Sequence, residues 1–487
     1  MSLPPLSKAA PYRRREPENG LWHKVLRENL LALIEGAKDP EDPESGLPSF
    51  VERELTDVLN CGQLSAGFLR LKCPDCKLER LVALSCEARA ACPSCGARRM
   101  AEGAAYLVDC VLPDVGLRQW VVTAPPELRV LLLADGAFLG AFIRIVVTTI
   151  FRHLCGKAAA LGIRGGQCGA ITFIQRFSST LSAFPHLHIV VFDGVYTKDG
   201  DAPPRFHRLS PPGERDEDFV SAGICLRVER LLERLGLVDP DAAAERPGTP
   251  LEKWFARAVV ERAHLSAVNA DGRVASGGRM APRRRSTSTG DVAGFSVHAR
   301  SAVRQGDRAG RERLLKYCLR PPFAERQLSE TEDGRIAFEL NTARTGGRTH
   351  LVLEPLRFLR RVAWLIPPPK QHQTRYAGVL APAAKLRPEV VPEHPVVAAI
   401  RGPPEGLSPG SAPASQARRR LDWARLLDRV HEIDALACPC GGRLRPIAAI
   451  LDPKIIRKIL EHLGVPADPP KLRPARAPPG DVQVDGG

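Results

Sequence analysis

The most informative run of this chain is Phe184-Pro185-His186-Leu187-His188-Ile189-Val190-Val191-Phe192. Its β-branched and aromatic residues are typical of a β-strand. Side chains alternate along a strand, so His186 and His188 should share one face while Leu187, Ile189 and Val191 pack into the core. Two imidazoles so placed on a rigid strand could chelate a divalent metal ion. The alternative is a pair of surface or hydrogen-bonded histidines, because short motifs of this kind often match by chance.

A third metal ligand should come from a neighbouring strand. Ala170–Phe177 is a β-rich run with a short connection to His186, which favours adjacent pairing. Gln175 lies on this run, and its amide oxygen could complete a site that suits Mg²⁺ or Mn²⁺. Gln175 is equally well explained as an ordinary polar residue of the strand.

A basic helix carrying Tyr317 is predicted over Arg311–Arg320, ended by the prolines that follow. Arg313 lies four residues before the tyrosine and Arg320 three after it, so both should flank the phenol. Nearby cations favour a phenolate and can hold a phosphate. Tyr317 is therefore a candidate nucleophile that would become covalently bound to DNA. The alternative is an ordinary tyrosine on an amphipathic helix.

A cysteine-rich block contains the pairs Cys73-x-x-Cys76 and Cys92-x-x-Cys95, separated by fifteen residues. This spacing is typical of zinc sites. Four thiolates predict one closed tetrahedral structural site, which leaves Cys61 as an extra thiol.

Three further features accompany this block. Cys86 is a second extra thiol. The basic residues Arg89, Arg98 and Arg99 predict contacts with DNA phosphates. Near the C-terminus, Cys438-Pro439-Cys440 is half of a metal knuckle for which the sequence offers no evident partner pair, so a turn or an incomplete site is the favoured interpretation.

Composition favours a nucleic-acid partner. Lys and Arg total 70 against 55 Asp and Glu, a net charge of +15, although a GC-rich genome that favours arginine would have the same effect. The most basic stretch, 281–320, includes the candidate DNA-binding residues Arg283, Arg284 and Arg285. Thirteen cysteines, several in close pairs, indicate metal binding in a reducing compartment. The sequence predicts neither a signal peptide nor a membrane span, hence a cytoplasmic protein without a membrane partner.

The pattern along the chain predicts six parts. They are a flexible basic tail (1–19), a zinc-binding DNA-recognition domain (20–105), a large central domain (106–387), a Pro/Gly-rich linker (388–417), a small C-terminal unit (418–463) and a disordered tail (464–487). Helices are expected over Leu21–Ile34, Phe50–Leu59, Leu128–Leu161 with a break near Asp135-Gly136, Asp218–Leu235, Leu251–His264 and Pro355–Leu365. Further strands are expected over Trp120–Thr123, Ile336–Leu340 and Thr349–Leu353, and a loop over Pro203–Pro212.

The motifs together resemble one family. These are Cys73-x-x-Cys76, Cys92-Pro93-Ser94-Cys95, Gln175-Arg176-Phe177, Pro185-His186-Leu187-His188 and Tyr317-x-x-Arg320-Pro321. Over about residues 20–460 and in the same order, the chain resembles the rolling-circle insertion-sequence transposases of the IS91 type and their common-region relatives.

The resemblance implies an α+β fold with an HUH endonuclease core, in which a central antiparallel sheet carries the histidines and a flanking helix carries the tyrosine. It also implies an N-terminal zinc-ribbon-like domain and a small helical C-terminal region. His186 and His188 match the family's metal-binding histidines, and Tyr317 matches its nucleophile. Two-tyrosine members have a second tyrosine four residues on, where this chain has Pro321. That departure fits a single-tyrosine branch, or one tyrosine used twice in a homodimer.

The implied function is a transposase that nicks and rejoins single-stranded DNA at element ends through a 5′-phosphotyrosine. It would use Mg²⁺ or Mn²⁺ at the histidines and structural Zn²⁺ at the cysteines. Two alternatives remain open. One is an HUH replication initiator or relaxase with the same chemistry, and the other is a non-catalytic zinc-ribbon DNA-binding protein.

Overall fold

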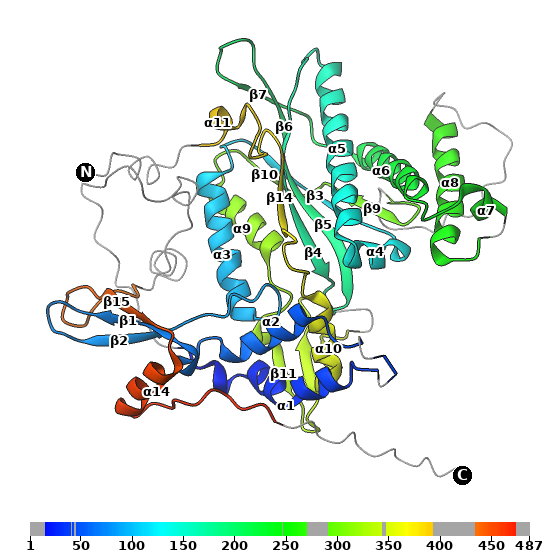
Figure 1. Ribbon diagram of the computed structural model, residues 1–487. Coiled ribbons are helices and arrows are strands. Elements are labelled where there is room, and N and C mark those ends of the chain that lie inside the picture. The colour runs from blue at the N-terminus through cyan, green and yellow to red at the C-terminus, as the bar shows by residue number, and fades with distance from the viewer. Residues whose placement is uncertain are drawn as a thin grey trace, which may run out of the picture.

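The computed structural model describes residues 15–39, 41–42, 45–245, 247–269, 291–342, 347–392 and 434–473 (Figure 1). The mixed helical and antiparallel architecture confirms the predicted α+β class. The arginines at 283–285, most of the expected basic tail and most of the expected linker lie outside the described residues.

A seven-stranded antiparallel sheet forms the centre of the molecule, in the order β14-β4-β5-β3-β9-β8, with β10 also paired to β3. Its strands are β3 (Leu117–Thr123), β4 (Gly169–Phe177), β5 (Ala183–Phe192), β8 (Asp291–Val292), β9 (Phe295–His298), β10 (Ala302–Val303) and β14 (Thr374–Gly378). The histidine strand β5 therefore lies between β4 and β3, where both of its edges are paired.

Helices cover both faces of this sheet (Figure 1). On one face lie α5 (Gly136–Ala160), α6 (Glu214–Arg234) and α8 (Pro250–Asn269), and on the other lie α3 (Pro93–Cys110) and α9 (Arg308–Leu319). Leu187, Ile189 and Val191 are buried in the first core, whereas Val190 and Phe192 are buried in the second. The predicted alternation along β5 is confirmed, and it turns His186 and His188 toward the face covered by α9.

Most predicted elements are present with shifted ends. The expected break near Asp135 separates α4 (Arg129–Ala134) from α5, because the Asp135 carboxylate accepts hydrogen bonds from the amides of Ala137 and Phe138 and caps α5.

The prediction of a loop at 203–212 is wrong in part. Residues Arg205–Arg208 form β7, paired with β6 (Gly194–Thr197), and the rings of Phe206 and Tyr196 lie 5.1 Å apart.

The long helix α5 has the length and apolar composition that could cross a membrane. In its most apolar window 56% is buried within the protein, against the central sheet and α6. Such burial is the property of a core helix.

The N-terminal region does not build its core alone. Helices α1 (Leu21–Glu35) and α2 (Ser49–Asn60) pack with α10 (Pro355–Leu365) and with a small sheet of β11 (Leu328–Glu330), β12 (Ile336–Glu339) and β13 (His350–Leu353). The ring of Trp22 meets those of Phe323 and Phe358 edge-on, at centroid distances of 5.2 and 5.8 Å. This core crosses the predicted boundary at residue 105.

The C-terminal unit also differs from the expected small helical region. The hairpin of β1 (Phe68–Lys72) and β2 (Glu79–Ala83) gains a third strand, β15 (Arg445–Ile450), which is followed by α14 (Pro453–His462). The remaining described helices of four or more residues are α7 (Pro240–Glu245) and α11 (Arg387–Val390).

Close packing of α3 on the end of α9 depends on two glycines. A Cβ added at Gly96 would lie 2.6 Å from Cβ of Pro321, and one at Gly103 would lie 3.0 Å from Cδ1 of Leu319. Neither distance leaves room for a side chain, so both glycines allow the end of the tyrosine helix to lie directly on α3.

We expect Gly96→Ala to lower the free energy of unfolding by about 1–3 kcal/mol, the usual cost of overpacking. The control is Gly156→Ala on α5, where an added Cβ meets nothing within 4 Å. Better helix propensity should raise stability there by about 0.5–1 kcal/mol. Urea unfolding followed by circular dichroism measures both. Equal stabilisation by the two substitutions would contradict the packing argument.

Candidate functional site

Two histidines and one tyrosine meet on the α9 face of the sheet. His186 pairs with Gln175 of β4, and the rings of His186 and His188 lie 4.9 Å apart. The ring of Tyr317, carried by α9, meets that of His188 edge-on at 5.3 Å. The tyrosine is 48% exposed, so a strand of DNA could reach its phenol. The structure thus brings Tyr317 next to a pair of histidines from which it is distant in the sequence.

Burial keeps both histidines in the neutral form. Burial lowers the pKa of His186, and burial with the neighbouring His186 and Arg320 lowers the pKa of His188 to about 3. Nδ1 of His186 lies 2.9 Å from the carbonyl oxygen of Phe184 and donates a hydrogen bond to it. The neutral ring therefore carries its proton on Nδ1, and Nε2 keeps a free lone pair.

Buried polar atoms without partners mark the site as one that could take a cation. Nε2 of His188 and Oε1 of Gln175 are buried and have no hydrogen-bond partner among the described residues. They are two of twelve such side-chain atoms in the described part of the chain. No Asp, Glu, Cys or third His of the described chain completes a group of three with the two histidines. Gln175 is paired with His186 across the strands, and its amide oxygen is the third ligand that the sequence predicts.

Gln175 also holds the tyrosine helix in place. Its Nε2 donates to the carbonyl oxygens of Tyr317 and Cys318 at 3.2 and 3.0 Å. On the other side, Nε2 of Gln119 lies 2.7 Å from Nδ1 of His188 and 3.5 Å from Sγ of Cys318. An amide nitrogen only donates, so in this orientation Nδ1 of His188 accepts and the neutral ring carries its proton on Nε2. Metal binding through Nε2 requires the Gln119 amide to be turned so that its oxygen accepts from Nδ1–H. Two glutamines from strands on either side of β5 therefore fix the last turn of α9 over the histidines.

The two predicted arginines are not equivalent. The guanidinium of Arg320 lies 4.8 Å from the ring centre of Tyr317 and 5.6 Å from that of Phe177. Arg313 is exposed one helical turn before the tyrosine. Arg320 is consequently the cation placed at the phenol.

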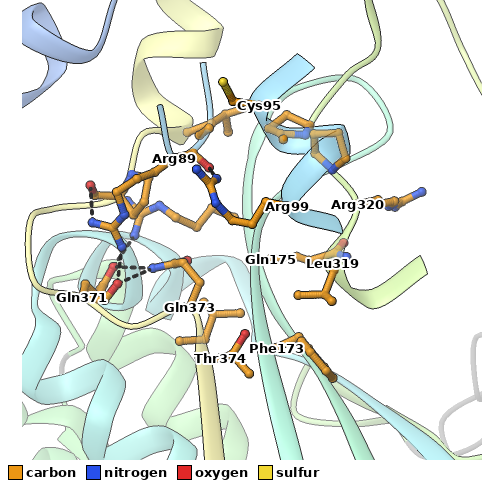
Figure 2. Close-up of a pocket in the computed structure, with 18 of the residues that line it drawn as sticks. Arg89, Cys95, Arg99, Phe173, Gln175, Leu319, Arg320, Gln371, Gln373 and Thr374 are labelled. Atoms are coloured by element: carbon orange, nitrogen blue, oxygen red, sulfur yellow. Dashed lines mark hydrogen bonds between the residues drawn. The ribbon is translucent and has the colours of Figure 1, made fainter. Parts of the chain in front are cut away.

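A basic cavity of about 710 Å³ adjoins the site (Figure 2). Gln175 and Arg320 line it, together with the start of α3 and the segment 367–374. Six of its lining side chains are positively charged and two, Glu87 and Glu102, are negatively charged. The positive ones are Arg89, Arg98, Arg99, Arg176, Arg320 and Lys370. A concave surface with this excess of positive charge attracts phosphates.

The arginines of the cavity also hold its walls. Arg99 donates to the carbonyl oxygens of Glu87, Ala88 and Arg89, and Arg98 to Oγ of Ser85 at 3.3 Å. Arg89 donates to the carbonyl oxygen of Pro368 at 2.6 Å. The sequence prediction named all three of these arginines as phosphate contacts, but it could not show that they also hold the walls of one cavity.

Arg176 is a lining residue to which sequence reasoning assigned no role, although it lies within the Gln175-Arg176-Phe177 motif. Burial and the nearby Arg89 lower the pKa of its guanidinium to about 10, so it stays charged at neutral pH. Its Nη1 lies 3.4 Å from Oε1 of Gln371 and its Nη2 donates to the carbonyl oxygen of Leu133 at 3.2 Å.

The predicted single zinc site is wrong, because the structure divides its four cysteines between two clusters. One consists of Cys61, Cys86, Cys92 and Cys95, and the other of Cys73, Cys76, Cys438 and Cys440. The β1–β2 hairpin carries Cys73 and Cys76 away from the start of α3, where Cys92 and Cys95 lie. In each cluster all four sulfur atoms lie within 4.8 Å of one another.

The first cluster has the geometry of a closed zinc site. Sγ of Cys61 lies 3.6 Å from those of Cys92 and Cys95, and Cys86 lies 3.6 Å from Cys95. Zn–S bonds of about 2.3 Å in a tetrahedron place sulfurs about 3.8 Å apart, so the residues fit a structural zinc ion.

Two family models match separate parts of the chain. The one described as "Transposase zinc-binding domain" matches residues 37–124, which contain the whole first cluster. The one described as "Putative transposase" matches residues 169–387, which contain the histidines and the tyrosine. No curated protein and no solved structure matches the chain. With its zinc-binding domain before its transposase domain, the chain is a transposase of the IS91 type, an enzyme that acts on DNA.

Proposed function

We propose that this transposase cleaves single-stranded DNA with Tyr317 as the nucleophile, beside a divalent cation held by His186, His188 and Gln175. The observation that carries the proposal is the contact between the Tyr317 and His188 rings, whose centroids lie 5.3 Å apart although they belong to a helix and a strand distant in sequence. An exposed phenol next to two neutral imidazoles is the arrangement that attack on a metal-bound phosphate requires.

In the proposed reaction each of these residues has a separate role. Mg²⁺ or Mn²⁺ bound at the two imidazoles would polarise the scissile phosphate. The Tyr317 oxygen attacks phosphorus, the bond to the 3′ oxygen breaks, and the phenol loses a proton while the departing oxygen gains one. The product is a 5′-phosphotyrosine and a free 3′-hydroxyl. Arg320 stabilises the charge that builds on the phosphate, and Gln175 keeps the helix backbone fixed during attack.

The basic cavity supports an approach of the DNA strand along α3. It lies next to Arg320, the residue that also contacts the tyrosine ring. Its volume of about 710 Å³ is comparable to that of a pocket for a small ligand and would suit a short piece of one strand. Arg98, Arg99, Arg176 and Arg320 would contact phosphates there, whereas Arg313 would contact DNA outside it.

Each chain offers one nucleophile at this site. Pro321 occupies the position four residues after Tyr317 and packs on Gly96, where it ends α9. Cleavage of two strands would therefore use Tyr317 twice in succession or use the Tyr317 residues of two chains in a homodimer. The phosphotyrosine retains the energy of the broken bond, so rejoining needs no other energy source.

Tyr317→Phe should abolish covalent protein–DNA adducts and leave binding of single-stranded DNA unchanged, because only the attacking oxygen is lost. Adducts are detected on a denaturing gel after incubation with single-stranded DNA and Mg²⁺ or Mn²⁺. The control is Tyr106→Phe on α3, which should form adducts like the unaltered protein.

Adducts that persist in Tyr317→Phe would exclude this residue as the nucleophile. Tight DNA binding by the unaltered protein without any metal-dependent adduct would instead favour a non-catalytic DNA-binding role. Equal cleavage of a duplex without unpaired bases would contradict the single-strand preference.

His188→Ala should weaken Mn²⁺ binding by at least about tenfold, since even residues that only orient a ligand commonly contribute that much. Titration calorimetry measures the affinity. The control is His207→Ala, which removes a half-buried histidine hydrogen-bonded to Oγ1 of Thr197 at 2.8 Å, away from the site.

Substitutions of Gln175 separate its two roles. Gln175→Leu loses both the free oxygen and the donor to α9, so Mn²⁺ affinity and adduct yield should both fall. Gln175→Glu keeps an oxygen but loses the donor, so Mn²⁺ should bind at least as tightly while adduct yield falls. Unchanged Mn²⁺ affinity in Gln175→Leu would show that this residue is no ligand.

A further inference from the structure

We propose that Cys73, Cys76, Cys438 and Cys440 bind a second zinc ion, and that this ion fastens the C-terminal residues 434–473 to the N-terminal hairpin. Cys438 and Cys440 lie outside both regions that the family models match. The site is thus not contained within the matched zinc-binding domain.

Two tight turns present the four thiols. After β1, the amide of Cys73 donates to the carbonyl oxygen of Leu78 at 2.9 Å, and Lys77 adopts a φ of 62°. Before β15, the amide of Cys438 donates to the carbonyl oxygen of Gly442 at 3.0 Å. Gly441 has a φ of 88°, a conformation that glycine adopts without strain. Each turn projects its pair of thiols toward the other pair.

The sulfur distances fit a shared metal ion and do not fit disulfides. Sγ of Cys73 lies 3.6 Å from that of Cys440, Sγ of Cys76 lies 3.4 Å from that of Cys438, and the latter lies 3.4 Å from Sγ of Cys440. A disulfide requires about 2.05 Å. Four thiolates around tetrahedral zinc lie about 3.8 Å apart, given Zn–S bonds of about 2.3 Å.

Strand pairing brings the two turns together. β15 runs antiparallel to β1 in the register Lys72↔Arg445 to Phe68↔Ile450, so the start of β15 lies beside the end of β1. The result is a three-stranded sheet with a pair of cysteines at the end of its hairpin and a second pair just before its third strand. This arrangement is a zinc ribbon assembled from the two ends of the chain.

The core of this ribbon is small, which is why a metal ion would matter. Its buried apolar residues other than cysteines are Leu71, Val82 and Leu444, and Ile456 and Leu460 of α14 cover Leu64 and Phe68 beside it. A unit of this size gains much of its folding free energy from a bound metal. Gly442 is needed for close approach, because a Cβ there would lie 3.2 Å from Sγ of Cys73.

A second contact holds the C-terminal segment against the N-terminal helix α1. Nη1 of Arg473 lies 2.9 Å from Oε1 of Glu28, and the amide of Arg473 donates to the carbonyl oxygen of Arg27 at 2.9 Å. The exposed ion pair contributes little by itself. Loss of the zinc should therefore release residues 434–473.

The first experiment counts zinc in the full chain. Native mass spectrometry and elemental analysis should find two zinc ions per unaltered chain and one in Cys438→Ser/Cys440→Ser. Limited proteolysis should release the C-terminal segment from that variant only. The control is Cys110→Ser, a cysteine of α3 outside both clusters, which should keep two ions and the same cleavage pattern.

A second experiment uses the unaltered protein and does not depend on a variant that folds. Cys76 and Cys440 are exposed, so iodoacetamide should alkylate them quickly if they are free thiols. Bound zinc should protect them until a chelator removes it. One zinc ion per unaltered chain, two in the double variant, rapid alkylation before chelation, or disulfides among these four cysteines would each overturn the proposal.

Discussion

The amide group of Gln175 is the constraint on which the site depends. Its nitrogen holds the last turn of α9 through the carbonyl oxygens of Tyr317 and Cys318, and its oxygen stays buried without a partner beside the histidine strand. With Gln119 on the other side of β5, this side chain fixes the position of the tyrosine relative to the imidazoles. Because β4 pairs with β5 in a fixed register, Gln175 lies opposite His186, and the geometry of helix and strand is coupled through the sheet itself.

The zinc-binding region belongs to the same structural unit as the site. The helix that begins at the first cysteine cluster, α3, lies against the end of α9, where Gly96 meets Pro321. Arg89 bridges from the cysteine block to the segment after α10 through the carbonyl oxygen of Pro368. The zinc ion of this cluster would thus stabilise a wall of the basic cavity as well as its own fold. A binding domain that moved freely on a linker would have no such effect on the tyrosine helix.

The sequence predicted what depends on local periodicity and missed what depends on long-range pairing. Alternation along β5 placed His186 and His188 on one face, and the break before α5 followed from a capping aspartate. Spacing identified Cys73 and Cys76 as a pair but could not show which other pair of cysteines completes their cluster. The pairing of β1 with β15, two strands far apart in the sequence, brings Cys438 and Cys440 to them. For the same reason sequence reasoning assigned Arg176 no role, since the cavity that it lines together with Arg89 exists only after the N-terminal helices pack on the sheet.

The pairing of β1 with β15 has a consequence for the order in which the protein is made. The ribosome completes β1 near residue 72 and reaches β15 only at residue 445. At typical rates of synthesis the delay is roughly 20–75 s. During that interval one edge of the β1–β2 hairpin has no neighbour, and an unpaired strand edge can associate with other chains. A truncated chain that lacks β15 would leave this edge of β1 exposed permanently, so truncated copies of this transposase should be prone to aggregation.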